Sequence, residues 1–111
     1  MIRRAALVAV ALFAATASAQ DPVVQITAKR FEFTPATLEL KVGVPVVLEL
    51  VALDRKHGFT APDLGIDAQV EPGTPLRLRV LPTRPGTFEF HCSVFCGSGH
   101  EEMTGQIVVK P

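Results

Sequence analysis

The sequence has little of what marks several large protein classes. It contains no tryptophan or tyrosine, only two cysteines, and 11 Lys and Arg against 11 Asp and Glu. Two cysteines cannot form the framework of a disulfide-rich scaffold. The even charge balance gives no indication of nucleic acid or an anionic membrane surface as a partner. We also find no carboxylate pair, no nucleophile beside a base and no phosphate-binding loop, so no catalytic residues for hydrolysis or group transfer can be named.

No apolar run is long enough to span a bilayer. The longest, Ala5 to Ala17, falls short of the roughly 20 residues that a membrane helix needs. A basic start precedes it, and Ala17-Ser18-Ala19 has the small-x-small form that signal peptidase accepts. We therefore expect residues 1–19 to be a signal peptide cleaved after Ala19. Residues 20–111 would then form one periplasmic or secreted domain without a stable membrane anchor, and an uncleaved anchor is the alternative.

Short runs of alternating apolar and polar residues fill the rest of the chain, separated by some of its nine prolines and eight glycines. Residues 76–80, Leu-Arg-Leu-Arg-Val, show the pattern most clearly. Six or seven such runs without a convincing amphipathic helix predict an all-β antiparallel sandwich or barrel, because this spacing leaves no room for parallel crossovers. The stretch from Leu53 to Glu71 is less regular, and we expect it to be a turn-rich loop.

Residues suited to metal binding gather in one short segment near the C-terminus. It holds both cysteines, one of three histidines and one of two methionines: Cys92, Cys96, His100 and Met103. Two thiolates, an imidazole and a thioether form a soft ligand set, which favours copper over the oxygen-seeking cations. A disulfide between the two cysteines, in a metal-free interaction domain, is the alternative.

The spacing of these four residues would also place them on one face of a helix, where such a stripe usually belongs to the core. Gly97 and Gly99 argue against a helix, because each would cost about 1 kcal/mol in its interior. The preceding residues 86–91 alternate as a strand does. We therefore predict a loop that follows a strand.

Four further polar residues bear on this chemistry. A lone histidine is usually a surface or hydrogen-bonded residue, but loops at one end of a sandwich can meet, so His57 could complete the site. His91 should point to the opposite side of its strand from Cys92 and act as a surface or supporting residue. Glu101 and Glu102 are either simply solvated or form an acidic rim for a basic partner.

Several landmarks together carry a family resemblance that covers nearly all of residues 20–111. They are His57-Gly58-Phe59, Pro62-x-Leu64-Gly65-Ile66, Pro72-Gly73, Pro85-Gly86-Thr87 and Cys92-x3-Cys96-Gly97-Ser98-Gly99-His100-x2-Met103. This combination resembles the dinuclear copper (CuA) domain of cytochrome c oxidase subunit II. The resemblance implies a single cupredoxin-type Greek-key β-sandwich with two copper ions.

The resemblance also implies a ligand set. Cys92 and Cys96 would bridge the two coppers, and His57 and His100 would each bind one. Met103 would be a weak axial ligand, and the backbone carbonyl of Val94 would be the other. Burial among Phe59, Val94, Phe95 and Met103 would keep water away from the centre.

The function implied is the passage of single electrons between proteins. The partner would be a redox protein, either a cytochrome c-like donor or an oxidase. The alternative is a periplasmic copper-binding protein that stores copper or delivers it to another copper-handling protein. Val94 stands where the family typically has a glutamate, and the family's pair of N-terminal membrane helices and its aromatic patch for cytochrome c are missing. These departures argue against a working subunit of a standard oxidase.

Overall fold

Nine β-strands form the computed structural model of the chain, which describes residues 21–95 and 97–111. The signal-peptide prediction falls on residues outside these ranges. The strands are β1 Val23–Lys29, β2 Glu32–Thr34, β3 Thr37–Lys41, β4 Val46–Ala52, β5 His57–Ala61, β6 Ile66–Val70, β7 Leu76–Val80, β8 Gly86–His91 and β9 Thr104–Lys110. Two short 3-10 turns, η1 Pro62–Leu64 and η2 His100–Glu102, follow β5 and precede β9.

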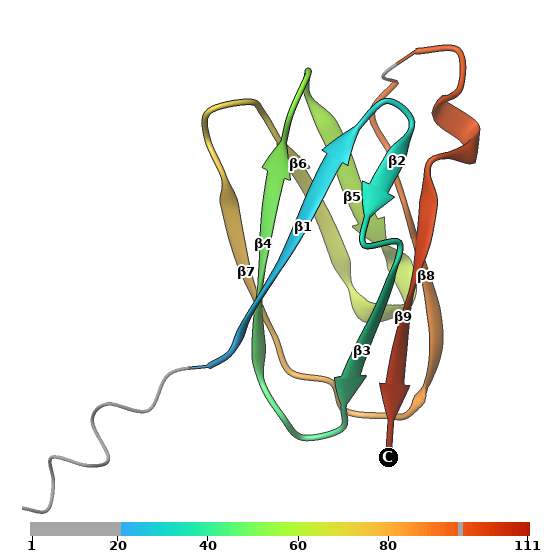
Figure 1. The fold of residues 1–111 in the computed structure, drawn as a ribbon. Helices are drawn as coiled ribbons and strands as arrows, with labels where there is room; N and C mark the ends of the chain where they lie inside the picture. The colour runs from blue at the N-terminus through green and yellow to red at the C-terminus, as the bar shows by residue number, and fades with distance from the viewer. Residues whose placement is uncertain (1–20, 96) are drawn as a thin grey trace, which may run out of the picture.

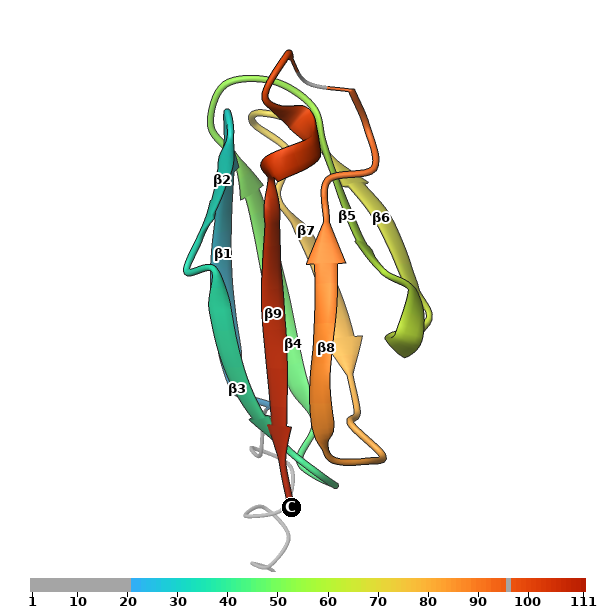
Figure 2. The ribbon, with the colours of Figure 1, turned by 90° about the vertical axis from the view of Figure 1, so that its right-hand side faces the viewer.

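The strands form two stacked sheets, which confirms the predicted all-β sandwich. One sheet has the order β2-β1-β4-β7, and the other has the order β3-β9-β8-β5-β6. Figure 2 looks onto the five-stranded sheet, with the four-stranded sheet behind it. Neighbours that are distant in the sequence, such as β3 and β9, are typical of Greek-key connections between two sheets.

Two expectations about the strands were wrong. β1 pairs with β4 and β3 pairs with β9 in parallel, whereas we expected only antiparallel pairs. The parallel partners are reached by chain that crosses between the sheets, so no helical crossover is needed. The region expected to be a turn-rich loop contains β5 and β6, which pair from His57 opposite Val70 to Ala61 opposite Ile66. β5 reads His-Gly-Phe-Thr-Ala and shows no clear alternation, whereas β6 reads Ile-Asp-Ala-Gln-Val and does alternate, so its pattern was overlooked.

The core lies between the sheets and is built from the inward-facing residues of each strand. In β4 every second residue is buried, from Val46 to Ala52. Phe33, Phe59 and Phe90 form an aromatic cluster, with ring centroids 4.7 to 5.8 Å apart. This cluster lies beneath one end of the sandwich, so it supports the loops at that end.

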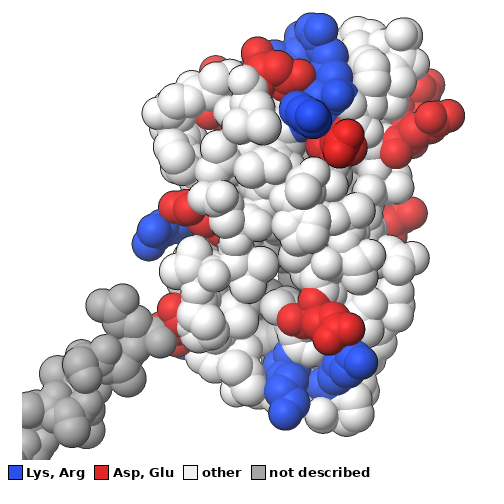
Figure 3. All heavy atoms as spheres, viewed as in Figure 1, with Lys and Arg blue, Asp and Glu red and all other residues white. Residues whose placement is uncertain are grey.

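The two segments expected to carry the chemistry emerge at the same end of the sandwich, together with the β1–β2 turn. Figure 1 shows the β4–β5 connection, the β1–β2 turn and the β8–β9 connection together at its upper end. The β3–β4 and β7–β8 connections lie at the opposite end. On the face shown in Figure 3, the basic side chains lie next to acidic ones, and the right-hand edge shows acidic side chains alone.

Candidate metal centre

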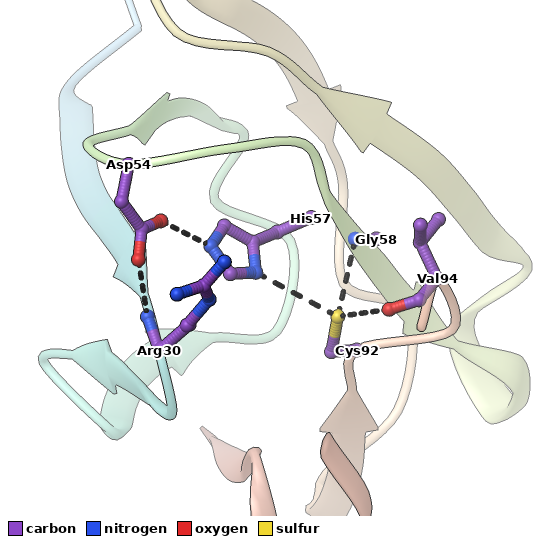
Figure 4. A network of polar contacts seen from close by, with 6 residues as sticks. All are labelled: Arg30, Asp54, His57, Gly58, Cys92 and Val94. Carbon is purple, nitrogen blue, oxygen red and sulfur yellow. Dashed lines mark hydrogen bonds and ion pairs between the residues drawn. The ribbon is translucent and has the colours of Figure 1, made fainter. Parts of the chain in front are cut away.

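His57 begins β5 and points into the protein. Its side chain is 0% exposed, and among the described residues it is the only buried polar side chain. Its Nε2 lies 2.7 Å from Asp54 Oδ1, and its Nδ1 lies 3.9 Å from Cys92 Sγ (Figure 4). Since a carboxylate can only accept, we assign the ring proton to Nε2. The lone pair of Nδ1 then faces the sulfur of Cys92.

Asp54 fixes the histidine ring in this orientation. Desolvation would raise the pKa of Asp54, but hydrogen bonds from the Arg30 backbone and the His57 ring outweigh it and lower the pKa to about 2. The Arg30 N–H donates to Oδ2 at 2.9 Å, so each carboxylate oxygen has a partner. A metal-bound histidine commonly donates its second ring N–H to a carboxylate in this way. Sequence reasoning missed Asp54, although its position three residues before His57 was a usable signal.

Cys92 comes directly after β8 and is held on several sides. Its side chain is 2% exposed, and its backbone N–H donates to the Met103 carbonyl at 3.1 Å. Its Sγ lies 3.3 Å from the Gly58 backbone nitrogen, which donates to it, and 3.1 Å from the Val94 carbonyl oxygen. Figure 4 shows the His57 ring, the Gly58 nitrogen and the Val94 carbonyl around this sulfur. Met103 is 0% exposed, so its thioether lies within the protein rather than at its surface.

Gly58 must be glycine because the ligand loop, residues 92–99, lies against it. A Cβ at position 58 would lie 2.7 Å from the Ser93 nitrogen and 3.0 Å from the Val94 nitrogen, and it would overlap Ser93 Oγ. Backbone atoms cannot move aside as a flexible side chain can. The strand that carries His57 is therefore in direct contact with the loop that carries Cys92. In the sequence, Gly58 was only one of the landmarks of the family resemblance, and nothing there indicated its contact with the ligand loop.

The β1–β2 turn forms a third wall of the site. The Arg30 backbone donates to Asp54, and the Phe31 ring lies on the far part of the ligand loop. A Cβ on Gly97 or on Gly99 would come within 2.8 Å of the Phe31 ring. These glycines do more than exclude a helix, because they admit an aromatic ring against the loop. No pattern within the ligand segment itself could have indicated this contact.

The two remaining predicted side-chain ligands from the C-terminal segment are Cys96 and His100. Cys96 lies outside the described residues, and the disulfide alternative therefore stays open. His100 begins η2, where the Glu102 N–H donates to the Gly99 carbonyl at 3.1 Å, and its backbone position is all that is described. Among the described residues, no three His, Cys, Asp or Glu side chains gather closely enough to hold a metal. The structure thus brings together His57, Cys92 and the Val94 carbonyl, and the complete ligand set stays a prediction.

Other expectations near the site have mixed outcomes. Residues 92–95 and 97–99 are not helical, which confirms the predicted loop there, and His100–Glu102 form the short 3-10 turn η2. Phe59 is fully buried, but Phe95 is 68% exposed and does not shield the site. His91 is half-buried between the buried Phe90 and Cys92, as expected for the opposite side of the strand. Glu101 and Glu102 are exposed.

The described donor atoms suit a soft, first-row metal ion. Bonds of about 2.0 Å to an imidazole nitrogen and about 2.3 Å to a thiolate sulfur are the usual lengths for such an ion. Together they can span the 3.9 Å between His57 Nδ1 and Cys92 Sγ without movement of either side chain. Buried, preset donors favour a tightly held metal, because little has to rearrange when it binds.

Within residues 21–95 and 97–111, no helix has the length and apolarity required to cross a membrane.

Comparison with known proteins agrees with the fold described above. The family described as a cupredoxin-like domain matches residues 3–109. Cytochrome c oxidase subunit 2 of Thermus thermophilus is 34% identical over 87 residues, which cover 78% of this chain and 64% of that protein. The chain therefore spans less than two thirds of the length of this relative.

Solved structures show the same likeness. A chain of a heme-copper terminal oxidase dimer aligns with a TM-score of 0.73 and 26% identity, covering 81% of this chain and 65% of that one. A structure of a mixed-disulfide intermediate between a thioredoxin-like protein and subunit II of cytochrome c oxidase aligns with a TM-score of 0.68. Its identity is 18%, with 80% of this chain and 81% of that chain covered, so it is a likeness of fold.

Proposed function

The chain belongs to the cupredoxin-like family, and from that premise we propose that it is an exported electron-transfer domain with a dinuclear copper centre of the CuA type. One observation carries the proposal. His57 Nδ1, the Gly58 N–H and the Val94 carbonyl all face the sulfur of the buried Cys92. The 34% identity to a cytochrome c oxidase subunit 2 supports the same conclusion.

The residues fit copper better than other common metals. Thiolate, imidazole and thioether are soft or borderline donors, and hard cations such as Mg²⁺ and Ca²⁺ prefer oxygen. Cys92 and Cys96 would bridge two ions, with His57 and His100 as terminal ligands. Met103 and the Val94 carbonyl would complete the set as weaker ligands. A mononuclear blue-copper site needs a single thiolate, so the second cysteine favours the dinuclear form.

Cys92 and Cys96 would hold the copper pair, which would supply the ability to take up and release one electron. The task of the protein is to keep the ligands in place while this charge changes. Asp54 holds the ring of His57, and the Gly58 N–H supports the sulfur of Cys92. Phe59, next to Gly58, and Met103, whose carbonyl accepts from the Cys92 N–H, are fully buried and would exclude water from the inner side. Ligands that hardly move give a small reorganisation energy and therefore fast electron transfer.

The partner would be another redox protein, such as a cytochrome c-like electron donor or an oxidase. Export with cleavage after Ala19 would place the domain in the periplasm or outside the cell. In an oxidising compartment the cysteine pair could form a disulfide that must be reduced before copper binds. A thioredoxin-like protein is a suitable reductant, since a related fold has been captured in a mixed disulfide with one.

Copper counting combined with spectroscopy tests this function. Reduced, metal-free protein should take up two coppers per chain, and electron paramagnetic resonance should show one unpaired electron shared by two similar ions. A single copper with a blue-type spectrum would reject the dinuclear centre.

A second measurement separates electron transfer from copper delivery. The loaded protein should cycle between oxidised and reduced forms with a small redox protein, followed by stopped-flow absorbance. It should keep both coppers against a moderate excess of a chelator. Rapid loss of copper to an acceptor protein, together with slow electron exchange, would instead establish copper delivery.

A further inference from the structure

A short chain of polar side chains on the outer face of the five-stranded sheet reaches the ligand loop. Thr60 of β5 lies opposite Asp67 of β6, and its Oγ1 is 3.1 Å from Asp67 Oδ1. The same Oγ1 lies 2.7 Å from the Oγ of Ser93, the residue between Cys92 and Val94. None of these three side chains belongs to the proposed ligand set.

The direction of these hydrogen bonds follows from the number of protons available. Thr60 has one hydroxyl proton, and a carboxylate can only accept. Thr60 therefore donates to Asp67, and Ser93 donates to Thr60. A hydrogen bond that ends on a charged group is stronger than one between neutral groups. Consecutive hydrogen bonds also polarise one another, which strengthens the bond that holds Ser93.

The position of Ser93 matters because the loop backbone at this point lies against Gly58. The Gly58 N–H donates to Cys92 Sγ across 3.3 Å, and the Val94 carbonyl lies 3.1 Å from the same sulfur. A small displacement of Ser93 would change both distances. Hydrogen bonding around a cysteine sulfur is one of the factors that set the reduction potential of a copper–thiolate site.

We propose that Thr60 and Asp67 are positioning residues of the copper centre. They hold Ser93 against β5 and so fix the hydrogen bond from Gly58 to the sulfur of Cys92. As a statement about the copper potential, the inference rests on the proposed function. As a statement about the position of the loop, it applies equally to the metal-free protein. A plain cross-strand contact would stabilise the sheet and leave the sulfur unchanged.

Thiol labelling of the metal-free protein tests the position of the loop without copper. In a Cys96→Ser background Cys92 is the only cysteine, and its 2% exposure means that a reagent reaches it when the loop opens. Thr60→Val keeps the shape of the side chain and removes the hydroxyl, and it should speed labelling about fivefold. Thr87→Val is the matched control, because Thr87 is exposed on the outer face of β8, and its labelling rate should not change.

Two more variants complete the labelling test. Thr60→Ser keeps the hydroxyl and should restore slow labelling. Asp67→Asn keeps the side-chain shape and removes the charge, so it should accelerate labelling less than Thr60→Val does. It replaces Thr60→Val as the test variant if the valine variant does not fold. Equal labelling rates in the Thr60 and Thr87 valine variants would overturn the inference.

The copper-loaded protein supplies the second readout. Thr60→Val should bind the same amount of copper as the unmodified protein but have a lower reduction potential. A weaker hydrogen bond from the Gly58 N–H leaves more electron density on the Cys92 thiolate. Its copper hyperfine pattern should also change, and Thr87→Val should match the unmodified protein. An unchanged potential at full loading would refute the positioning role. If the unmodified chain fails to bind two coppers, the proposed function fails, and the labelling rates alone decide this inference.

Discussion

Replacing Gly58 with alanine should damage both the stability of the fold and the metal centre. The added Cβ would lie 2.7 Å from the Ser93 nitrogen and 3.0 Å from the Val94 nitrogen, closer than a Cβ atom can sit without displacing its neighbours. Because these are backbone atoms of the ligand loop, the loop has to move away from β5. That movement lengthens the hydrogen bond from the residue 58 backbone to Cys92 Sγ, which is 3.3 Å in the native protein.

The size of the effect follows from the cost of overpacking a buried position. Forcing one methyl group into a well-packed site typically costs 1–3 kcal/mol, so about 2 kcal/mol is expected here. In a domain of roughly 100 residues, each kcal/mol lowers Tm by about 4–8 °C. The variant should therefore melt about 10 °C below the native protein in its metal-free form.

Gly43→Ala is the matched control for this experiment. Gly43 lies in the β3–β4 turn at the opposite end of the sandwich, with φ of 80°, and a methyl group added there would have no atom within 4 Å. Its alanine variant suffers backbone strain of about 1–2 kcal/mol but no clash. Both variants should lose stability in thermal unfolding followed by circular dichroism. Only the Gly58 variant should also change the copper content or the absorbance spectrum.

Two results would refute this reasoning. A Gly58→Ala protein with native Tm and native copper spectrum would show that the ligand loop does not lie against β5 as described. An equal change of the copper spectrum in Gly43→Ala would show that the effect comes from lost stability in general rather than from the contact at Gly58.

The remaining predictions concern the ligands, their support and export. Cys92→Ser or Cys96→Ser should abolish the shared-electron signal in electron paramagnetic resonance, because one thiolate cannot make a double bridge. Met103→Leu should keep both coppers and shift the reduction potential, and loss of copper from this variant would contradict the ranking of the ligands. Asp54→Ala should weaken copper binding about tenfold or more in chelator titrations, since the His57 ring loses the carboxylate that orients it; unchanged affinity would show that the ring is held in another way. Exported protein should begin at Gln20 by intact mass and N-terminal sequencing, and retention of residues 1–19 would overturn the signal-peptide prediction.

The strand pattern shows how far local sequence reaches. Alternating apolar residues in 46–52 and 76–80 identify β4 and β7, because a strand with one buried face has a period of two. The same rule did not reveal β5, since its residues His-Gly-Phe-Thr-Ala do not alternate clearly by hydrophobicity. The residues Ile-Asp-Ala-Gln-Val of β6 do alternate, so β6 was a usable signal that was overlooked. β5 is nevertheless buried at four of its five positions, where its residues face the ligand loop and the core.

Part of the candidate site also follows from the sequence alone, and part follows only from the tertiary structure. The amino-acid sequence by itself determined the donor types, because two cysteines, a histidine and a methionine at short spacing define a soft ligand set wherever the chain places them. It also determined that this segment is a loop after a strand, since Gly97 and Gly99 disfavour a helix and residues 86–91 alternate as a strand does. These conclusions depend only on residue chemistry and local backbone preference.

Only the tertiary structure decided which distant residues surround that segment. Asp54 orients His57, Gly58 contacts the ligand loop, and Phe31 lies on loop glycines that come far later in the chain. Parallel pairing of β1 with β4 and of β3 with β9 brings the three loops to one end. Such pairings depend on how two sheets pack and bury their apolar faces together, and no local pattern in the sequence encodes that choice.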